Sequence, residues 1–198
     1  MKRISILFAL IFATAATAAS LSKTRADGKI SVGAIVENFS LPDVDGEARS
    51  LNDLKGEKGT AIIFLSAQCP VVKGYNERIN QIADDYKSKG INFIGINSNA
   101  SESLDWVKSN AVEVGYKFPV LIDKGNVLAD KLGANVTPEV FYLDAKNVLL
   151  YHGAIDNDRS GKNITDNYLR TTFDASLDGK KIDRTSANAF GCSIKRVN

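Results

Sequence analysis

The sequence predicts an α/β fold in which a central mixed sheet is covered by helices on both faces. Short apolar segments alternate with amphipathic segments of helical period along the chain. Two of the apolar segments, residues 60–66 and 91–96, carry few polar residues, which is typical of strands buried on both faces. Near the end of this pattern, residues 140–143 and 148–152 flank a polar turn and predict an antiparallel hairpin.

The first elements begin near residue 39. Residues 39–42, followed by the turn at 44–46, predict a short N-terminal β-hairpin, and residues 50–54 predict one helical turn. After strand 60–66, an amphipathic helix buries apolar residues at spacings of three and four and stops near Gly90. Those apolar residues are Val72, Tyr75, Ile79, Ile82 and Tyr86.

The later elements continue the alternation of strands and helices. Strand 91–96 is followed by a helix that we expect to be capped by Ser101. Its expected buried residues are Leu104, Val107, Ala111 and Val114. The remaining elements are an extended segment at 118–122, a brief helix at 127–132 stopped by Gly133, the hairpin, and a final helix at 164–177 ended by Gly179. The rest of the chain shows little periodicity.

The N-terminus has the features of a cleaved secretory signal. Lys2 and Arg3 precede an apolar run at 4–12, and Ala16-Thr17-Ala18 has the form of a cleavage site. The run is shorter than the roughly 20 residues that span a bilayer, so a cleaved signal is favoured over an uncleaved anchor. We therefore expect an exported protein, periplasmic or secreted, that is cleaved near Ala18 and is not embedded in a membrane.

These features divide the chain into four parts. They are a signal peptide at 1–18, a linker at 19–31, a single domain at 32–179 and a C-terminal tail at 180–198 that carries Cys192. Removal of the signal takes away two of 25 basic residues and no acidic residue, which leaves 23 of each sign. Because phosphate binding needs a basic face, a nearly neutral chain argues against nucleic acid as a partner.

Cys69 lies where the apolar strand meets the N-terminus of the following helix, with Pro70 in the first helical turn. The helix end offers free N–H groups and a partial positive charge, and both stabilise a thiolate. Lys73, one turn along, adds a positive charge nearby. The alternative is an inert buried cysteine, but a position in a turn favours a reactive one.

The resemblance to a known family rests on several groups of residues along the chain. They are Phe39-Ser40-Leu41-Pro42-Asp43 with Gly46 and Ser50-Leu51, then Ala61-Ile62-Ile63-Phe64-Leu65, then Cys69-Pro70, and finally Thr137-Pro138 with Phe141-Tyr142-Leu143-Asp144. On these the chain resembles the redoxin, or AhpC/TSA (peroxiredoxin-like), branch of exported thiol proteins within the thioredoxin-like superfamily. The resemblance implies a three-layer thioredoxin-like fold in which Pro138 is cis and faces Cys69. It also implies a substrate groove formed by Gln68, Pro70, Thr137 and Pro138.

The sequence departs from the patterns of this superfamily. Val72 stands where thioredoxins have their second cysteine, so chemistry between two cysteines within one turn is excluded. Cys192 in the tail can supply the resolving thiol if the tail folds back, or the two cysteines can form a permanent structural disulfide. Against peroxiredoxins, Ser66 replaces a threonine, Ile62 replaces a proline, and Pro138 stands where an arginine is expected.

The sequence therefore predicts an exported thiol-disulfide oxidoreductase with an antioxidant role in redox homeostasis. Cys69 would attack, Cys192 would resolve, Ser66 would orient the substrate and Lys73 would assist the thiolate. Its partners would be a protein or small-molecule disulfide, or a peroxide, together with an unidentified thiol electron donor. A peroxiredoxin-like peroxidase and a non-catalytic binding module with a structural disulfide stay open as alternatives.

We expect neither a cofactor nor a metal. The single histidine, His152, ends a strand and has no cysteine or carboxylate at metal-ligand spacing. Residues 156–161 imitate the start of a calcium loop, but Asn167 stands where such a loop needs a bidentate glutamate.

Overall fold

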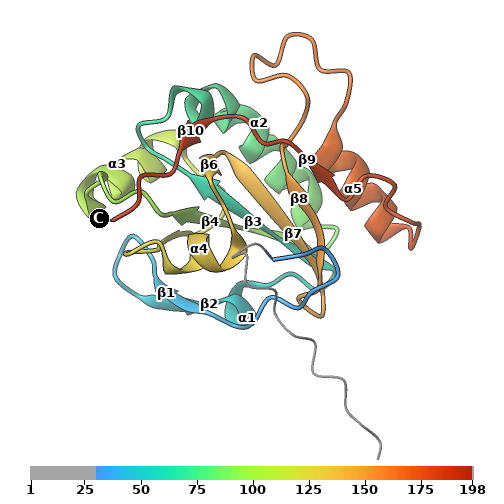
Figure 1. Ribbon diagram of the computed structural model, residues 1–198, viewed down its shortest axis with the longest axis horizontal. Coiled ribbons are helices and arrows are strands. Elements are labelled where there is room, and N and C mark those ends of the chain that lie inside the picture. The colour runs from blue at the N-terminus through green and yellow to red at the C-terminus, as the bar shows by residue number, and fades with distance from the viewer. Residues whose placement is uncertain (1–29, 198) are drawn as a thin grey trace, which may run out of the picture.

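A mixed sheet with helices on both faces forms the centre of the computed structural model, which describes residues 30–197 (Figure 1). This architecture confirms the predicted fold class. The expected signal at 1–18 and nearly all of the expected linker at 19–31 lie outside the described residues.

The central sheet has six strands. In spatial order they are β5 (Val120–Ile122), β4 (Ile91–Asn97), β3 (Gly59–Leu65), β7 (Glu139–Asp144), β8 (Leu149–Gly153) and β9 (Ser186–Ala187). Strands β3, β4 and β5 run parallel, β7 is antiparallel to both β3 and β8, and β9 is parallel to β8. The predicted hairpin of β7 and β8 is thus confirmed.

Two small sheets lie beside the central one. The predicted N-terminal hairpin is present as β1 (Ser40–Pro42) and β2 (Ala48–Ser50). The other small sheet pairs β6 (Val136–Thr137) with β10 (Cys192–Ser193) in antiparallel register. This second pairing brings the end of the chain back onto the segment that precedes Pro138.

Helices α2 (Pro70–Lys87) and α5 (Tyr168–Leu177) contribute to one hydrophobic core, and α1 (Leu51–Leu54) and α4 (Val127–Leu132) contribute to the other. Every residue of β3 is buried, because its side chains enter both cores in alternation. The five apolar residues predicted for the buried face of α2 are all buried.

None of the helices within residues 30–197 combines the length and apolar character that a bilayer crossing requires.

The starts of two helices differ from the sequence-based expectation. Helix α3 (Leu104–Val114) is capped by Ser103, whose hydroxyl accepts the N–H of Trp106, so the prediction of Ser101 as cap is wrong. Leu104 is 47% exposed, and only Val107 of the predicted face is buried. Helix α5 begins at Tyr168, not at residue 164, because the Asn157 side chain binds the N–H groups of residues 165 and 166.

The final segment is ordered despite its lack of periodicity. Its residues form β9 at the edge of the central sheet and then β10 beside β6. In Figure 1 this red segment crosses from the β9 edge, past β10, to the side of the molecule that carries α3.

Candidate active site around Cys69 and Cys192

Cys69 caps the N-terminus of α2, directly after the turn that leaves β3. Pro70 is the first helical residue, where its missing N–H costs no hydrogen bond. The Cys69 residue is only 3% exposed. Its sulfur therefore meets the free amides and partial positive charge of a long helix while most of the solvent is excluded.

The peptide bond between Thr137 and Pro138 is cis and lies next to this sulfur. The thiol of Cys69 donates to the carbonyl oxygen of Thr137 at 3.3 Å. The structure thus places Cys69 opposite the Thr137-Pro138 bend, as the resemblance implied. Strand β7 of the central sheet begins directly after Pro138, so the bend has a fixed relation to that sheet.

Strand β10 brings Cys192 to the same place from the end of the chain. In the antiparallel register Cys192 lies opposite Thr137, and Ser193 lies opposite Val136. Both cysteines are free thiols; Cys69 is buried and Cys192 is half-buried. Each thiol is close enough to shift the pKa of the other. The two candidate catalytic cysteines are therefore together although 122 residues separate them in sequence.

The environment of the pair gives the two thiols different acidities. Burial raises the pKa of Cys69, but hydrogen bonds from the Cys192 thiol, the Val72 N–H, the Thr137 side chain and the Cys192 N–H outweigh it, so this pKa is lowered. Burial, the hydrogen bond to Cys69 and the negative charge on Cys69 raise the pKa of Cys192, against a smaller opposing effect of the Val71 N–H. Cys69 is accordingly the more acidic thiol, the first of the two to ionise, and Cys192 keeps its proton to higher pH.

We expect the substitution Cys192→Ala to raise the pKa of Cys69, because it removes the hydrogen-bonding thiol. The measurement is thiolate absorbance near 240 nm against pH in the reduced protein. Because the folded state favours the Cys69 thiolate, the wild-type absorbance should appear below the ordinary cysteine range, about pH 8.5. Cys192→Ser, which keeps a donor hydroxyl, should shift the midpoint less. Equal midpoints in the wild type and Cys192→Ala would contradict the assignment.

Ser66 lies close in sequence to Cys69, but its hydroxyl is committed elsewhere. It is 7% exposed and donates to the Oε1 atom of Glu102 at 2.5 Å. The carboxylate of Glu102 also accepts the N–H groups of Ala67 and Gln68, at 3.0 and 3.1 Å, and the side-chain amide of Asn97 at 2.6 Å. Glu102 therefore fixes the turn that delivers Cys69. Sequence reasoning missed Glu102, because nothing near it marks a partner 34 to 36 residues away.

The other predicted site residues lie around Cys69, some on the surface and some buried. Gln68, Pro70 and Lys73 are exposed, while Thr137 is buried beside the sulfur. The backbone N–H of Lys73 binds the Cys69 carbonyl at 3.0 Å as part of the helix. The groups that lower the pKa of Cys69 come from Cys192, Val72 and Thr137. Assistance to the thiolate from the Lys73 side chain stays a prediction.

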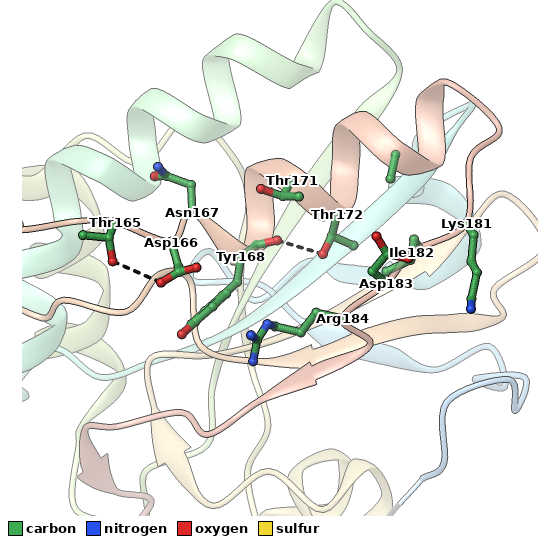
Figure 2. A pocket seen from close by; sticks show the side chains of 11 residues that line it. Thr165, Asp166, Asn167, Tyr168, Thr171, Thr172, Lys181, Ile182, Asp183 and Arg184 are labelled. Atoms are coloured by element: carbon green, nitrogen blue, oxygen red, sulfur yellow. Dashed lines mark hydrogen bonds between the residues drawn. The ribbon is translucent and has the colours of Figure 1, made fainter.

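A separate hollow lies beside α5 and contains neither cysteine. It has a volume of about 380 Å³ and is bounded by the start of α5 and by residues 181–184 (Figure 2). The guanidinium of Arg184 lies 4.9 Å from the centre of the Tyr168 ring. The two basic side chains that line the hollow, Lys181 and Arg184, are balanced in charge by two acidic ones, Asp166 and Asp183.

Nowhere in residues 30–197 do three or more His, Cys, Asp or Glu side chains gather so as to hold a metal ion.

Comparison with known families agrees with this geometry. The model of the AhpC/TSA family matches residues 32–152, a range that includes Cys69 and Thr137-Pro138 and ends before Cys192. The thiol-disulfide oxidoreductase ResA of Bacillus anthracis is 31% identical over 116 residues. That match covers 59% of this chain and 65% of the relative, so the chain spans about two thirds of the relative's length.

Solved structures match a larger share of this chain than the relative above does. A hypothetical protein from Sinorhizobium meliloti has a TM-score of 0.79 and 34% identity, over 85% of this chain and 96% of that one. An uncharacterized conserved protein from Geobacillus kaustophilus has a TM-score of 0.78 and 33% identity, over 83% and 92%. A putative thiol:disulfide interchange protein DsbE from Chlorobium tepidum, 20% identical over 75% and 99%, shares the thioredoxin-like fold with a TM-score of 0.64.

Proposed function

The chain belongs to the AhpC/TSA family, and from this premise we propose that it is a thiol-disulfide oxidoreductase that uses Cys69 and Cys192 as a redox pair. The observation that carries the proposal is that Thr137 contacts the Cys69 sulfur and pairs with Cys192, so the two cysteines meet at one site, with the pKa of Cys69 lowered and that of Cys192 raised. This difference assigns an attacking sulfur and a resolving sulfur within one site.

The proposed reaction has two exchange steps. The Cys69 thiolate attacks one sulfur of a substrate disulfide, the substrate S–S bond breaks, and one substrate half leaves as a thiolate that takes up a proton. Cys192 then loses its proton and attacks the sulfur of Cys69, which expels the second half as a thiolate. The substrate has gained two electrons, and Cys69 and Cys192 are joined. Two thiols of an external electron donor reduce this disulfide and are themselves oxidised to a disulfide.

The alternatives have weaker support. A peroxidase needs a hydroxyl beside the thiolate to orient the peroxide, whereas the Ser66 hydroxyl donates to Glu102. Ile62 and Pro138 also replace residues typical of peroxiredoxins. A non-catalytic module with a structural disulfide would not require a lowered pKa at Cys69. Disulfide exchange is therefore the function that the geometry favours.

The remaining parts of the proposal concern the chain as a whole. The basic and apolar character of residues 1–18 supports export, periplasmic or secreted, after cleavage near Ala18. In that setting a role in redox homeostasis would suit a thiol pair. We further propose that the tail at 180–198 is a working part of the site, because it supplies Cys192 to the domain at 32–179.

Differential alkylation with mass spectrometry tests the redox pair. The mature protein is oxidised with excess oxidised glutathione, the free thiols are blocked, and the bonded ones are labelled after reduction. We expect a Cys69–Cys192 disulfide that forms and is reduced reversibly at a potential above about −300 mV, the range of labile disulfides. A pair that never links, or a bond that resists physiological thiols, would contradict the proposal.

A further inference from the structure

The outer edge of β6 is the place where an extended peptide would be expected to add a strand beside Cys69. In this protein that edge is already occupied. Strand β10 pairs with Val136 and Thr137, and the N–H of Ile194 continues the ladder by donating to the Asn135 carbonyl at 2.9 Å. A second peptide cannot pair with this edge while β10 is in place.

We propose that residues 186–197, which we call the C-terminal strap, restrict Cys69 to small disulfides and exclude disulfides held in extended polypeptide. The proposal rests on the proposed function and adds the class of substrate. Three observations support it: the occupied edge of β6, the anchors of the strap on both sides of Cys192, and the low exposure of Cys69.

The strap is anchored before the site by β9. Ser186 and Ala187 pair with His152 and Gly153 at the edge of the central sheet. The approach is so close that a Cβ on Gly153 would lie 1.8 Å from the Ala187 carbonyl oxygen. Between this anchor and the site, the ring of Phe190 lies 6.4 Å from that of Tyr75.

After the site the strap is held by buried asparagines and by a core contact. Ile194 is 6% exposed and belongs to the core that contains α1 and α4. The Lys195 N–H donates to the Asn99 side chain at 3.0 Å, and the Val197 N–H donates to the Asn126 side chain at 2.8 Å. Asn126 is itself buried, with a backbone φ of 61°, an arrangement that an asparagine tolerates better than most residues.

Arg196 adds two further contacts beyond Cys192. Its guanidinium donates to the Ala134 carbonyl oxygen at 2.6 Å and forms an ion pair with Asp130 at 3.1 Å. The strap is thus fixed on both sides of Cys192 and lies beside Cys69, which is 3% exposed. A small disulfide needs only to reach the sulfur of Cys69, whereas a polypeptide strand needs the backbone edge of β6 as well. The strap therefore sets the size of the substrate.

The test compares two disulfides in single-turnover reactions of the fully reduced protein. Oxidised glutathione serves as the small disulfide and insulin as the polypeptide disulfide. Two variants loosen the strap: a chain that ends after Ser193, which keeps Cys192 but removes the later anchors, and Arg196→Ala. Val197→Ala is the matched control, because it keeps the backbone hydrogen bond to Asn126 and changes an exposed side chain.

We expect the wild type and Val197→Ala to react with oxidised glutathione at least about 100-fold faster than with insulin. Loosening the strap should raise the insulin rate by about tenfold or more and leave the glutathione rate within about threefold, since it raises the fraction of molecules with an open edge. Circular dichroism checks that each variant is folded. If the chain that ends after Ser193 does not fold, the comparison is made with Arg196→Ala alone.

Two results would overturn the proposal. One is a wild-type rate with insulin that equals the rate with oxidised glutathione. The other is an insulin rate that stays unchanged in the folded loosened variants. A lack of reaction with both disulfides would instead overturn the proposed thiol-disulfide exchange, and the restriction on substrate with it.

Discussion

Cys69→Ser is expected to lower the rate of exchange with small disulfides by at least about a thousandfold, because a serine hydroxyl stays protonated where the thiol ionises. The fold should persist, since serine has nearly the same shape and its hydroxyl can still donate to the Thr137 carbonyl oxygen. The measurement is the single-turnover rate with oxidised glutathione, with the thermal midpoint of unfolding as the check on folding.

The same variant should also change the remaining thiol. The charge of the Cys69 thiolate and the hydrogen bond to it raise the pKa of Cys192, so their removal should lower the pKa of Cys192. The matched control is Cys192→Ser, which keeps the first exchange and should accumulate a mixed disulfide on Cys69. Substantial exchange by Cys69→Ser, or a mixed disulfide found mainly on Cys192 of the wild type, would reject Cys69 as the attacking sulfur.

The sequence predicts well those parts of the site that depend on local pattern. The apolar run of β3, the helical period of α2 and Pro70 together place Cys69 at the N-cap, and the structure has it there. These features arise within about thirty consecutive residues, where periodicity and capping rules apply directly. The cis bond before Pro138 agrees with the family resemblance, although nothing local to the sequence demands it.

The parts that escape sequence reasoning depend on contacts between distant segments. Strand β10 has only two residues, too few for an alternating pattern, and it exists because it pairs with β6, 56 residues earlier. Glu102 shapes the turn before Cys69 from 34 to 36 residues further along the chain. The sequence therefore indicates that the tail can supply the second thiol. Neither the path of the tail nor the residues that anchor it can be derived from the sequence.

Gly191→Ala is the substitution with the largest expected effect on the geometry of the pair. A Cβ at this position would lie 1.9 Å from the carbonyl oxygen of Thr137 and 2.6 Å from its carbonyl carbon. These are backbone atoms next to the Thr137-Pro138 bend, so they cannot swing aside as the end of a side chain can. The strap itself must move, and Cys192 follows Gly191 directly.

We expect this variant to form the Cys69–Cys192 disulfide at least about tenfold more slowly, since moving the thiols apart reduces the fraction of productive encounters. The free energy of unfolding should fall by about 1–3 kcal/mol, the usual cost of forcing an extra carbon into a packed site. The pKa of Cys69 should rise, because the Cys192 donors withdraw. Mass spectrometry of timed, acid-quenched samples measures disulfide formation, and denaturant unfolding measures stability.

Gly74→Ala provides the matched control within α2. Its Cβ would have Arg159 as its nearest neighbour, with the carbonyl oxygen at 3.7 Å, an ordinary contact distance. Because alanine favours a helix interior over glycine, this variant should be as stable as the wild type or more stable by up to about 1 kcal/mol. Disulfide formation should proceed at the wild-type rate in Gly74→Ala. If Gly191→Ala matched it in rate and stability, the close approach of the strap to Thr137 would not control how Cys192 meets Cys69.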